Sequence, residues 1–153
     1  MFEKVLYPTD FSEVSQKALG YITKLKSAGL NQVVVLRIID QKKVENISRG
    51  VGWAGLEVAE FLKQTKQWLQ EEAKKEMEPI ESVLRKAGIE VKERVETGDP
   101  RTRIVEVAEE EDVSAIVLGS HGRNNVSSVL LGSVATNVIH HSKRPVVVIK
   151  RDA

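Results

Sequence analysis

A nine-residue run, QVVVLRIID at residues 32–40, limits the folds open to this chain more than any other feature. β-branched and other apolar residues follow one another too continuously to leave one face of a strand in water. Strands covered on both faces are typical of parallel sheets that carry helices on each side. We therefore expect an α/β protein in which residues 32–40 form a central strand.

The remaining segments alternate between strand and helix patterns. Four more have the character of strands: residues 4–8, 89–96, 114–119 and 144–150. Between them lie helical patterns, the longest at residues 58–87, where Pro79 is expected to kink the helix. Asp99 and Pro100 are expected to start the next helix as N-cap and first helical residue. Strict alternation with long crossovers predicts one domain over residues 1–153, with a doubly wound, five-stranded parallel sheet in the order 3-2-1-4-5.

Residues 40–57 do not fit this alternation. The segment is long for a connection and contains three glycines and Trp53. It is either a mobile functional loop or a partly helical excursion. We favour a surface excursion whose Trp53 packs on the body of the protein over a lid for a ligand or a contact with a partner.

Composition narrows the function classes. The chain has 23 basic and 22 acidic residues, interspersed along the sequence, so nothing indicates a groove for nucleic acid or a basic patch for membranes. Cysteine is absent, which removes thiol catalysis and thiolate metal sites and fits a reducing compartment. The start of the chain lacks the pattern of a signal peptide, and no apolar run approaches the roughly 20 residues that span a bilayer. We expect a cytoplasmic protein with neither membrane nor nucleic-acid partners.

Two unusual loops fall where this sheet order predicts a ligand site. In the order 3-2-1-4-5, the carboxyl ends of strands 1 and 4 flank a crevice. YPTDFS follows strand 1, and GSHGRNNVSSVLLGS follows strand 4. Gly119, Gly122 and Gly132 could bring bare backbone and the amides that start the last helix close to a phosphate. A single glycine would more simply end a strand or admit a helix, but the set at this position favours a cradle.

Four polar residues near these loops leave alternatives open. Ser133 could cap the last helix or donate its hydroxyl to a phosphate. Asp10 could accept hydrogen bonds from a ribose or an adenine, or cap the first helix in a capping box with Glu13, while Ser12 offers a second cap. His121 could contact a phosphate or act as a base, although we expect it to face solvent. The GxGxxG and GxxxxGK[ST] motifs are both missing, which disfavours a dinucleotide site and a Walker-type NTPase.

The loop spacing resembles that of a known family. GxxG, nine residues and GS, together with YPTDFS after the first strand, resemble the ATP-binding branch of the universal stress protein family. The likeness covers nearly the whole chain, from KVLYPTDFS to RPVVVIKR. It implies a Rossmann-like adenine-nucleotide-binding fold, with ATP or AMP in the crevice and a magnesium or manganese ion held through the phosphates. No carboxylate pair here has the spacing of metal ligands, so no metal-binding residue is predicted.

The resemblance also implies which residues surround the nucleotide. Pro8, Thr9 and Asp10 would face the adenosine, with Ile38 near the adenine and Leu118 and Gly119 near the ribose. The residues implied to line the phosphates are Gly122, Arg123, Gly132, Ser133 and Val134. Some relatives have a hydroxyl residue where this chain has Ala135, so one contact to the γ-phosphate would be lost.

The family further implies a homodimer joined through the last strand, at Val146, Val147, Val148 and Ile149. An independent argument agrees, because an apolar edge strand must be covered or paired, and a two-fold axis is the simplest closure. The first functional hypothesis is a stress-response regulatory protein that binds an adenine nucleotide and acts on an unknown downstream protein. The alternative is a slow ATP hydrolase or a phosphoryl or adenylyl transferase that uses Ser133, His121 or Asp10. A receiver-like phosphoacceptor domain with Asp10 as its target ranks last.

Overall fold

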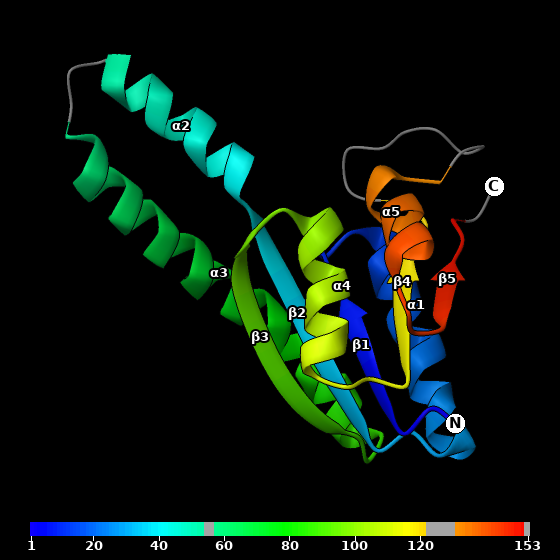
Figure 1. The fold of residues 1–153 in the computed structure, drawn as a ribbon. Coiled ribbons are helices and arrows are strands. Elements are labelled where there is room, and N and C mark those ends of the chain that lie inside the picture. Colours follow the sequence, from blue (N-terminus) through cyan, green and yellow to red (C-terminus); the bar gives the residue numbers. More distant parts are fainter. Residues whose placement is uncertain (54–56, 122–130, 152–153) are drawn as a thin grey trace.

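The computed structural model describes residues 1–53, 57–121 and 131–151. Its five strands form one sheet in the order β3-β2-β1-β4-β5, and every neighbouring pair is parallel (Figure 1). Their bounds are β1 Lys4–Pro8, β2 Gln32–Asp40, β3 Glu90–Gly98, β4 Ala115–Gly119 and β5 Val146–Ile149. This confirms the doubly wound parallel sheet and the strand order that the sequence predicts.

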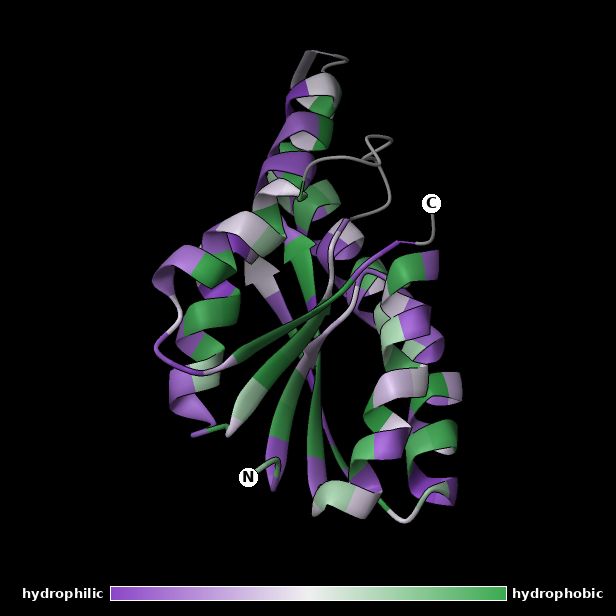
Figure 2. Cartoon of the chain, turned by 90° about the vertical axis from the view of Figure 1, so that its right-hand side faces the viewer, coloured by the Kyte–Doolittle hydropathy of each residue, from purple (hydrophilic) through white to green (hydrophobic). Residues whose placement is uncertain are grey.

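Helices cover both faces of the sheet. They are α1 Glu13–Lys24, α2 Gln41–Trp53, α3 Val58–Lys86, α4 Pro100–Glu110 and α5 Ser133–His141, with a 3-10 turn at Leu25–Ala28. One core layer contains residues of α1 and α3, and the other contains residues of α4 and α5. Figure 2 shows hydrophobic residues concentrated along the strands, whereas the helices carry both kinds. Within the part of the chain that the structure describes, no helix is long and apolar enough to cross a membrane.

Strand β2 behaves as its continuous apolar sequence predicts. Val33 and Val35 point into the α1 and α3 layer, while Val34 and Leu36 point into the α4 and α5 layer. All four side chains are inaccessible to solvent. The alternation of side chains along a strand thus places half of the run in each core.

The segment that follows β2 forms an arm. Residues 41–53 are helical, and Figure 1 shows α2 and the first half of α3 extending side by side away from the sheet. The partly helical interpretation is confirmed, but the expectation that Trp53 packs on the body is wrong, because its side chain is 93% exposed. Only Val44 and Ser48 of α2 are buried, so the outer end of this helix lies beyond the reach of the core. Helix α3 continues on both sides of Pro79.

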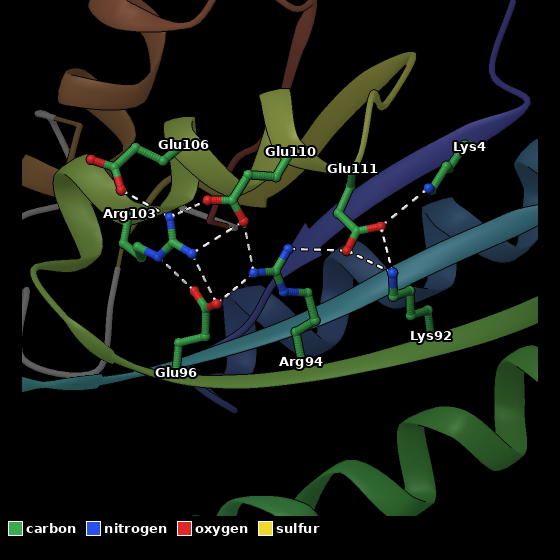
Figure 3. A network of polar contacts seen from close by, with 8 residues as sticks. All are labelled: Lys4, Lys92, Arg94, Glu96, Arg103, Glu106, Glu110 and Glu111. Carbon is green, nitrogen blue, oxygen red and sulfur yellow. Dashed lines mark hydrogen bonds and ion pairs between the residues drawn. The ribbon is translucent and has the colours of Figure 1, made fainter.

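An ion network joins β3 to α4 on the flank of the sheet (Figure 3). Glu111 is buried and accepts hydrogen bonds from Lys4, Lys92 and Arg94 at 3.0–3.1 Å. Burial opposes ionisation of Glu111, but these three cations outweigh it and lower the pKa of the carboxyl. Arg103 and Arg94 likewise lower the pKa of Glu110 to about 2. The network fixes the edge strand β3 to the end of α4.

Candidate functional site

A cleft of about 1080 Å³ opens at the carboxyl ends of β1, β2 and β4. It lies at the switch point where connections leave β1 in opposite directions, as the sheet order predicts. The cleft brings together the predicted residues Pro8, Thr9, Asp10, Ile38, Leu118, Gly119, Gly132, Ser133 and Val134. Gly122 and Arg123 lie outside the described residues.

The loop after β1 is held by a buried chain of hydroxyl groups. Tyr7 Oη donates to the Ser15 carbonyl at 2.6 Å, and Ser15 Oγ donates to Thr9 Oγ1 at 2.6 Å. Thr9 Oγ1 also accepts from the Phe11 amide at 3.0 Å. Burial raises the pKa of Tyr7, although its hydrogen bonds to Ser15 and Thr9 partly oppose the shift. The Thr9 hydroxyl therefore contributes to the cleft chiefly by fixing the shape of this loop.

Asp10 lines the cleft, and Ser12 caps the helix. Ser12 Oγ accepts from the Ser15 amide at 3.3 Å, which makes Ser12 the N-cap of α1. Asp10 Oδ1 accepts from the Ser12 amide at 3.0 Å in a local turn. Phe11 between them has φ 62°, in the left-handed region that few non-glycine residues adopt. The sequence offered both Asp10 and Ser12 as possible caps of this helix, and in the structure Ser12 is the cap.

The start of α5 presents backbone amides to the cleft. Gly132 is the N-cap, with φ −62° and ψ 159°, and none of the side chains that the structure describes caps this helix. The first helical bond runs from the Thr136 amide to the Gly132 carbonyl at 3.0 Å, so the amides of residues 133–135 have no acceptor within the helix. The prediction that Ser133 could be the cap is wrong, because Ser133 is the first helical residue and its side chain is exposed. These amides and the helix dipole favour an anion.

Three other helices begin beside the cleft, and each has a side-chain oxygen at its start: at α2, Asp40 Oδ1 accepts from the Lys42 amide at 3.0 Å. Ser12 caps α1, and the Asp99 carboxylate accepts from the Arg101 amide at 3.0 Å to cap α4, which confirms the predicted start at Pro100. A hydroxyl or carboxylate oxygen already occupies those helix starts. Among these four helices, α5 is therefore the one whose start is suited to an external anion.

His121 is buried beside this helix start. Its side chain is 7% exposed and lines the cleft, so the expectation that it faces solvent is wrong. Ser120 Oγ lies 2.7 Å from His121 Nδ1, and Ser120 itself is almost fully buried. A loop position after a strand gives no sequence signal for such burial, which depends on the contact of two adjacent side chains inside the fold. His140 and His141, in contrast, lie in the last turn of α5.

Gly119 is required by a neighbouring helix. A Cβ at this position would lie 2.8 Å from Val14 Cγ1 and 3.3 Å from the Val14 carbonyl carbon. The first helix therefore packs directly on the backbone where β4 ends. This close approach explains Gly119 without a ligand, although the same residue also lines the cleft.

The arm supplies a wall of the cleft that the sequence did not reveal. Lys43 and Ile47 of α2 and Trp68 and Glu72 of α3 line it. Arg37 at the end of β2 lies over the Phe11 ring at 5.6 Å and donates to the Ile38 carbonyl at 3.2 Å. Among the described residues, no group of three or more histidine or acidic side chains is placed to hold a metal ion.

The sheet order and the cleft at its switch point define a Rossmann-like α/β protein. The sequence profile of the universal stress protein family matches residues 1–150, and the chain belongs to this family. It is 42% identical over 156 residues to universal stress protein MJ0577 of Methanocaldococcus jannaschii, which covers 99% of this chain and 96% of the relative. The solved structure of MJ0577 superposes with a TM-score of 0.88 at 39% identity, covering 100% of this chain and 99% of that one.

Two more distant structures share the fold and hold nucleotides. A universal stress protein in complex with cAMP has a TM-score of 0.66 at 21% identity, with 97% of each chain covered. The universal stress protein of Archaeoglobus fulgidus in complex with dAMP has a TM-score of 0.62 at 23% identity, with 98% of each chain covered.

Proposed function

We propose that the cleft binds an adenine nucleotide, ATP or AMP, and that the protein is a homodimeric regulator of a stress response in the cytoplasm. The observation that carries the proposal is the start of α5, where three amides without helical acceptors face a cleft at the switch point. Bound cAMP and dAMP in two proteins of the same fold support the choice of ligand. A divalent ion would be held through the phosphates.

The proposed site combines an anion end with an adenosine end. Ser133 and Val134 would offer amides to the phosphates, together with Gly122 and Arg123 of the glycine loop. Pro8, Thr9 and Asp10 would border the adenosine from the opposite side of the cleft. Ile38 and Leu118 are buried to within about 5% and belong to one apolar core, so they would meet the base and ribose with their backbone and one apolar edge.

Ser133→Pro tests the anion end without disturbing the fold. Proline is tolerated at the first helical position, and the extended backbone of Gly132 suits the residue before a proline. The variant removes one amide donor and the hydroxyl, while Ser133→Ala removes the hydroxyl alone. A hydrogen bond to a charged group is worth roughly 1.5–3 kcal/mol, so we expect ATP affinity to fall about 10- to 150-fold in Ser133→Pro.

Calorimetric titration of ATP with magnesium into nucleotide-free protein measures this change. We expect Ser133→Ala to bind nearly as tightly as the parent protein. Equal affinity in Ser133→Pro and Ser133→Ala would show that the α5 amides do not bind the phosphates. A parent protein that binds no nucleotide, confirmed by equilibrium dialysis, would refute the proposed ligand.

The homodimer would form through β5, which pairs with β4 alone among the strands that the structure describes. The carbonyls of Pro145 and Ile149 accept from the β4 side, and alternation along the strand then turns the amides of Val146 and Val148 outward. Val148→Pro removes an outward amide, and edge strands tolerate proline where the amide faces solvent. We expect sedimentation to give a monomer for Val148→Pro and a dimer for Val148→Thr, which keeps the amide. Two dimers would exclude this edge as the interface.

The enzymatic alternative rests on the groups that the cleft brings together. Asp10, His121 and Ser133 all line it, as a slow hydrolase or a phosphoryl or adenylyl transferase would require. Turnover separates the two functions. Nucleotide consumption that disappears in His121→Ala or Asp10→Asn would favour the enzyme, and none above background with candidate acceptors and metals would favour the regulator.

A further inference from the structure

Ser120, the residue after β4, makes contacts that the β4 and β5 pairing alone does not require. Its amide donates to the Ile149 carbonyl at 2.8 Å, which continues the ladder of the two strands. Its carbonyl would next accept from the Arg151 amide if that ladder went on. The carbonyl accepts instead from the Gly132 amide at 2.8 Å, and so holds the N-cap of α5.

The Ser120 hydroxyl, in place of the Ser120 carbonyl, accepts the hydrogen bond from the chain after β5. The Arg151 amide donates to Ser120 Oγ at 3.2 Å, so the rung to the chain after β5 is kept by a side chain. The same oxygen lies 2.7 Å from His121 Nδ1. A hydroxyl can donate to an unprotonated Nδ1 or accept from a protonated one, and in either case it fixes the orientation of the ring. One buried residue thus joins the end of β5, the start of α5 and a histidine of the cleft.

We propose that Ser120 is a positioning residue that couples the anion end of the cleft to the β5 edge. Its carbonyl sets the position of the α5 amides, and its hydroxyl sets the orientation of the His121 ring, which lines the cleft and would contact the phosphates. The positions of the Ser120 carbonyl and hydroxyl both depend on the hydrogen bond from the Arg151 amide. Pairing of β5 with a second copy would stabilise the chain at Arg151 and, through it, this hydrogen bond. The inference rests on the proposed nucleotide site and on the proposed dimer.

Arg151→Pro tests the hydrogen bond between Ser120 and the chain after β5. Residue 151 does not line the cleft, and the substitution removes the amide that donates to Ser120 while leaving the hydroxyl in place. Arg151→Ala is the matched control, because it loses the same side chain but keeps the amide. A neutral hydrogen bond corresponds to about a two- to tenfold change in affinity, so we expect Arg151→Pro to weaken ATP binding by that factor relative to Arg151→Ala.

Two serine variants test the role of the Ser120 hydroxyl. Ser120→Ala removes the hydroxyl after β4, and Ser114→Ala removes the hydroxyl before β4, at the amino ends of the strands, where it accepts from the Lys4 amide at 3.3 Å. We expect Ser120→Ala to lower ATP affinity by about three- to thirtyfold and Ser114→Ala to leave it unchanged. Thermal melting of each variant establishes that it is folded.

The coupling between ATP binding and dimer formation is a measurement that a purely structural role of Ser120 would not change. If β5 pairing and the cleft are coupled, ATP affinity differs by some factor between the dimer and the Val148→Pro monomer, and saturating ATP strengthens the dimer by the square of that factor, because each copy binds one ATP. We expect this factor to fall to about one when Ser120→Ala or Arg151→Pro is present. His121→Ala should weaken ATP binding but leave the dimer constant without ATP unchanged.

The outcomes separate this inference from the proposed function. A parent protein that binds no ATP refutes both. A parent that binds ATP, with equal affinities for Arg151→Pro and Arg151→Ala and for Ser120→Ala and Ser114→Ala, refutes the role of Ser120 and leaves the nucleotide site standing. Equal ATP affinities in the dimer and in the Val148→Pro monomer refute the coupling to β5.

Discussion

Gly119→Ala tests whether the glycine that ends β4 is required by the neighbouring helix. An alanine Cβ would lie 2.8 Å from Val14 Cγ1 and 3.3 Å from the Val14 carbonyl carbon, closer than such atoms normally approach. Overpacking of a tight interior costs about 1–3 kcal/mol. At roughly 2–4 °C for each kcal/mol in a chain of this size, we expect the melting temperature to fall by about 2–12 °C.

A double-mutant cycle identifies Val14 as the cause. Val14→Ala removes Cγ1, the nearest atom, but leaves the backbone carbon at 3.3 Å. We therefore expect the loss from Gly119→Ala to shrink by about 0.5–2 kcal/mol in the Val14→Ala background without vanishing. Urea unfolding of the four proteins measures the coupling free energy.

Gly20→Ala is the matched control. This glycine lies in α1, on an exposed face, and its added Cβ would meet nothing within 4 Å. Alanine is the better helix former, so the control should gain about 0.5–1 kcal/mol. An equal loss from Gly119→Ala with and without the Val14 side chain would refute the steric explanation of Gly119.

Four further predictions concern the body and the arm. Glu111→Gln should lower the free energy of unfolding in urea by about 1–2 kcal/mol, because its three cationic partners lose the negative charge that they share. The loss stays modest because one partner, Lys92, is half exposed and screened by solvent. Because the folded pKa values of Glu110 and Glu111 are lowered, parent stability should hold above about pH 5 and decline as the pH falls towards 2; a flat profile in that window would contradict the network. Tyr7→Phe should cost about 1–2 kcal/mol through the lost bond to Ser15, and an unchanged midpoint would count against that bond. Trp53→Ser should change stability by less than about 0.5 kcal/mol, whereas a loss of several kcal/mol would mean that this tryptophan packs on the body after all.

The sheet could be predicted because its signals are local. The run at residues 32–40 carries apolar side chains for both faces, which fixes β2 as a buried parallel strand in any arrangement that covers it. Asp99 and Pro100 mark the start of α4 because a cap and a proline act within one turn. The crevice then follows from strand order, so the predicted residues that the structure describes meet in one cleft.

The parts that could not be predicted depend on contacts between distant segments. Trp53 looks like a core residue by type, yet α2 leaves the sheet and Trp53 is 93% exposed. Asp10 and Ser12 both have capping chemistry, and the left-handed backbone of Phe11 decides between them. His121 is polar and lies in a loop, but the Ser120 hydroxyl partners its ring inside the protein. Composition and periodicity contain none of this information.

Gly119 and Gly132 both line the cleft, and both also make close backbone contacts within the fold. Gly119 lets α1 approach the end of β4, and this brings the loop that carries Asp10 to one side of the cleft. Gly132 starts α5 with no capping side chain among the described residues and is itself held by Ser120, which leaves the next amides on the other side. A side chain at residue 119 would move α1, and with it Asp10, relative to those amides. Close packing of bare backbone is therefore what sets the width of the cleft, so Gly119→Ala should weaken nucleotide binding in proportion to the strain that Val14→Ala relieves.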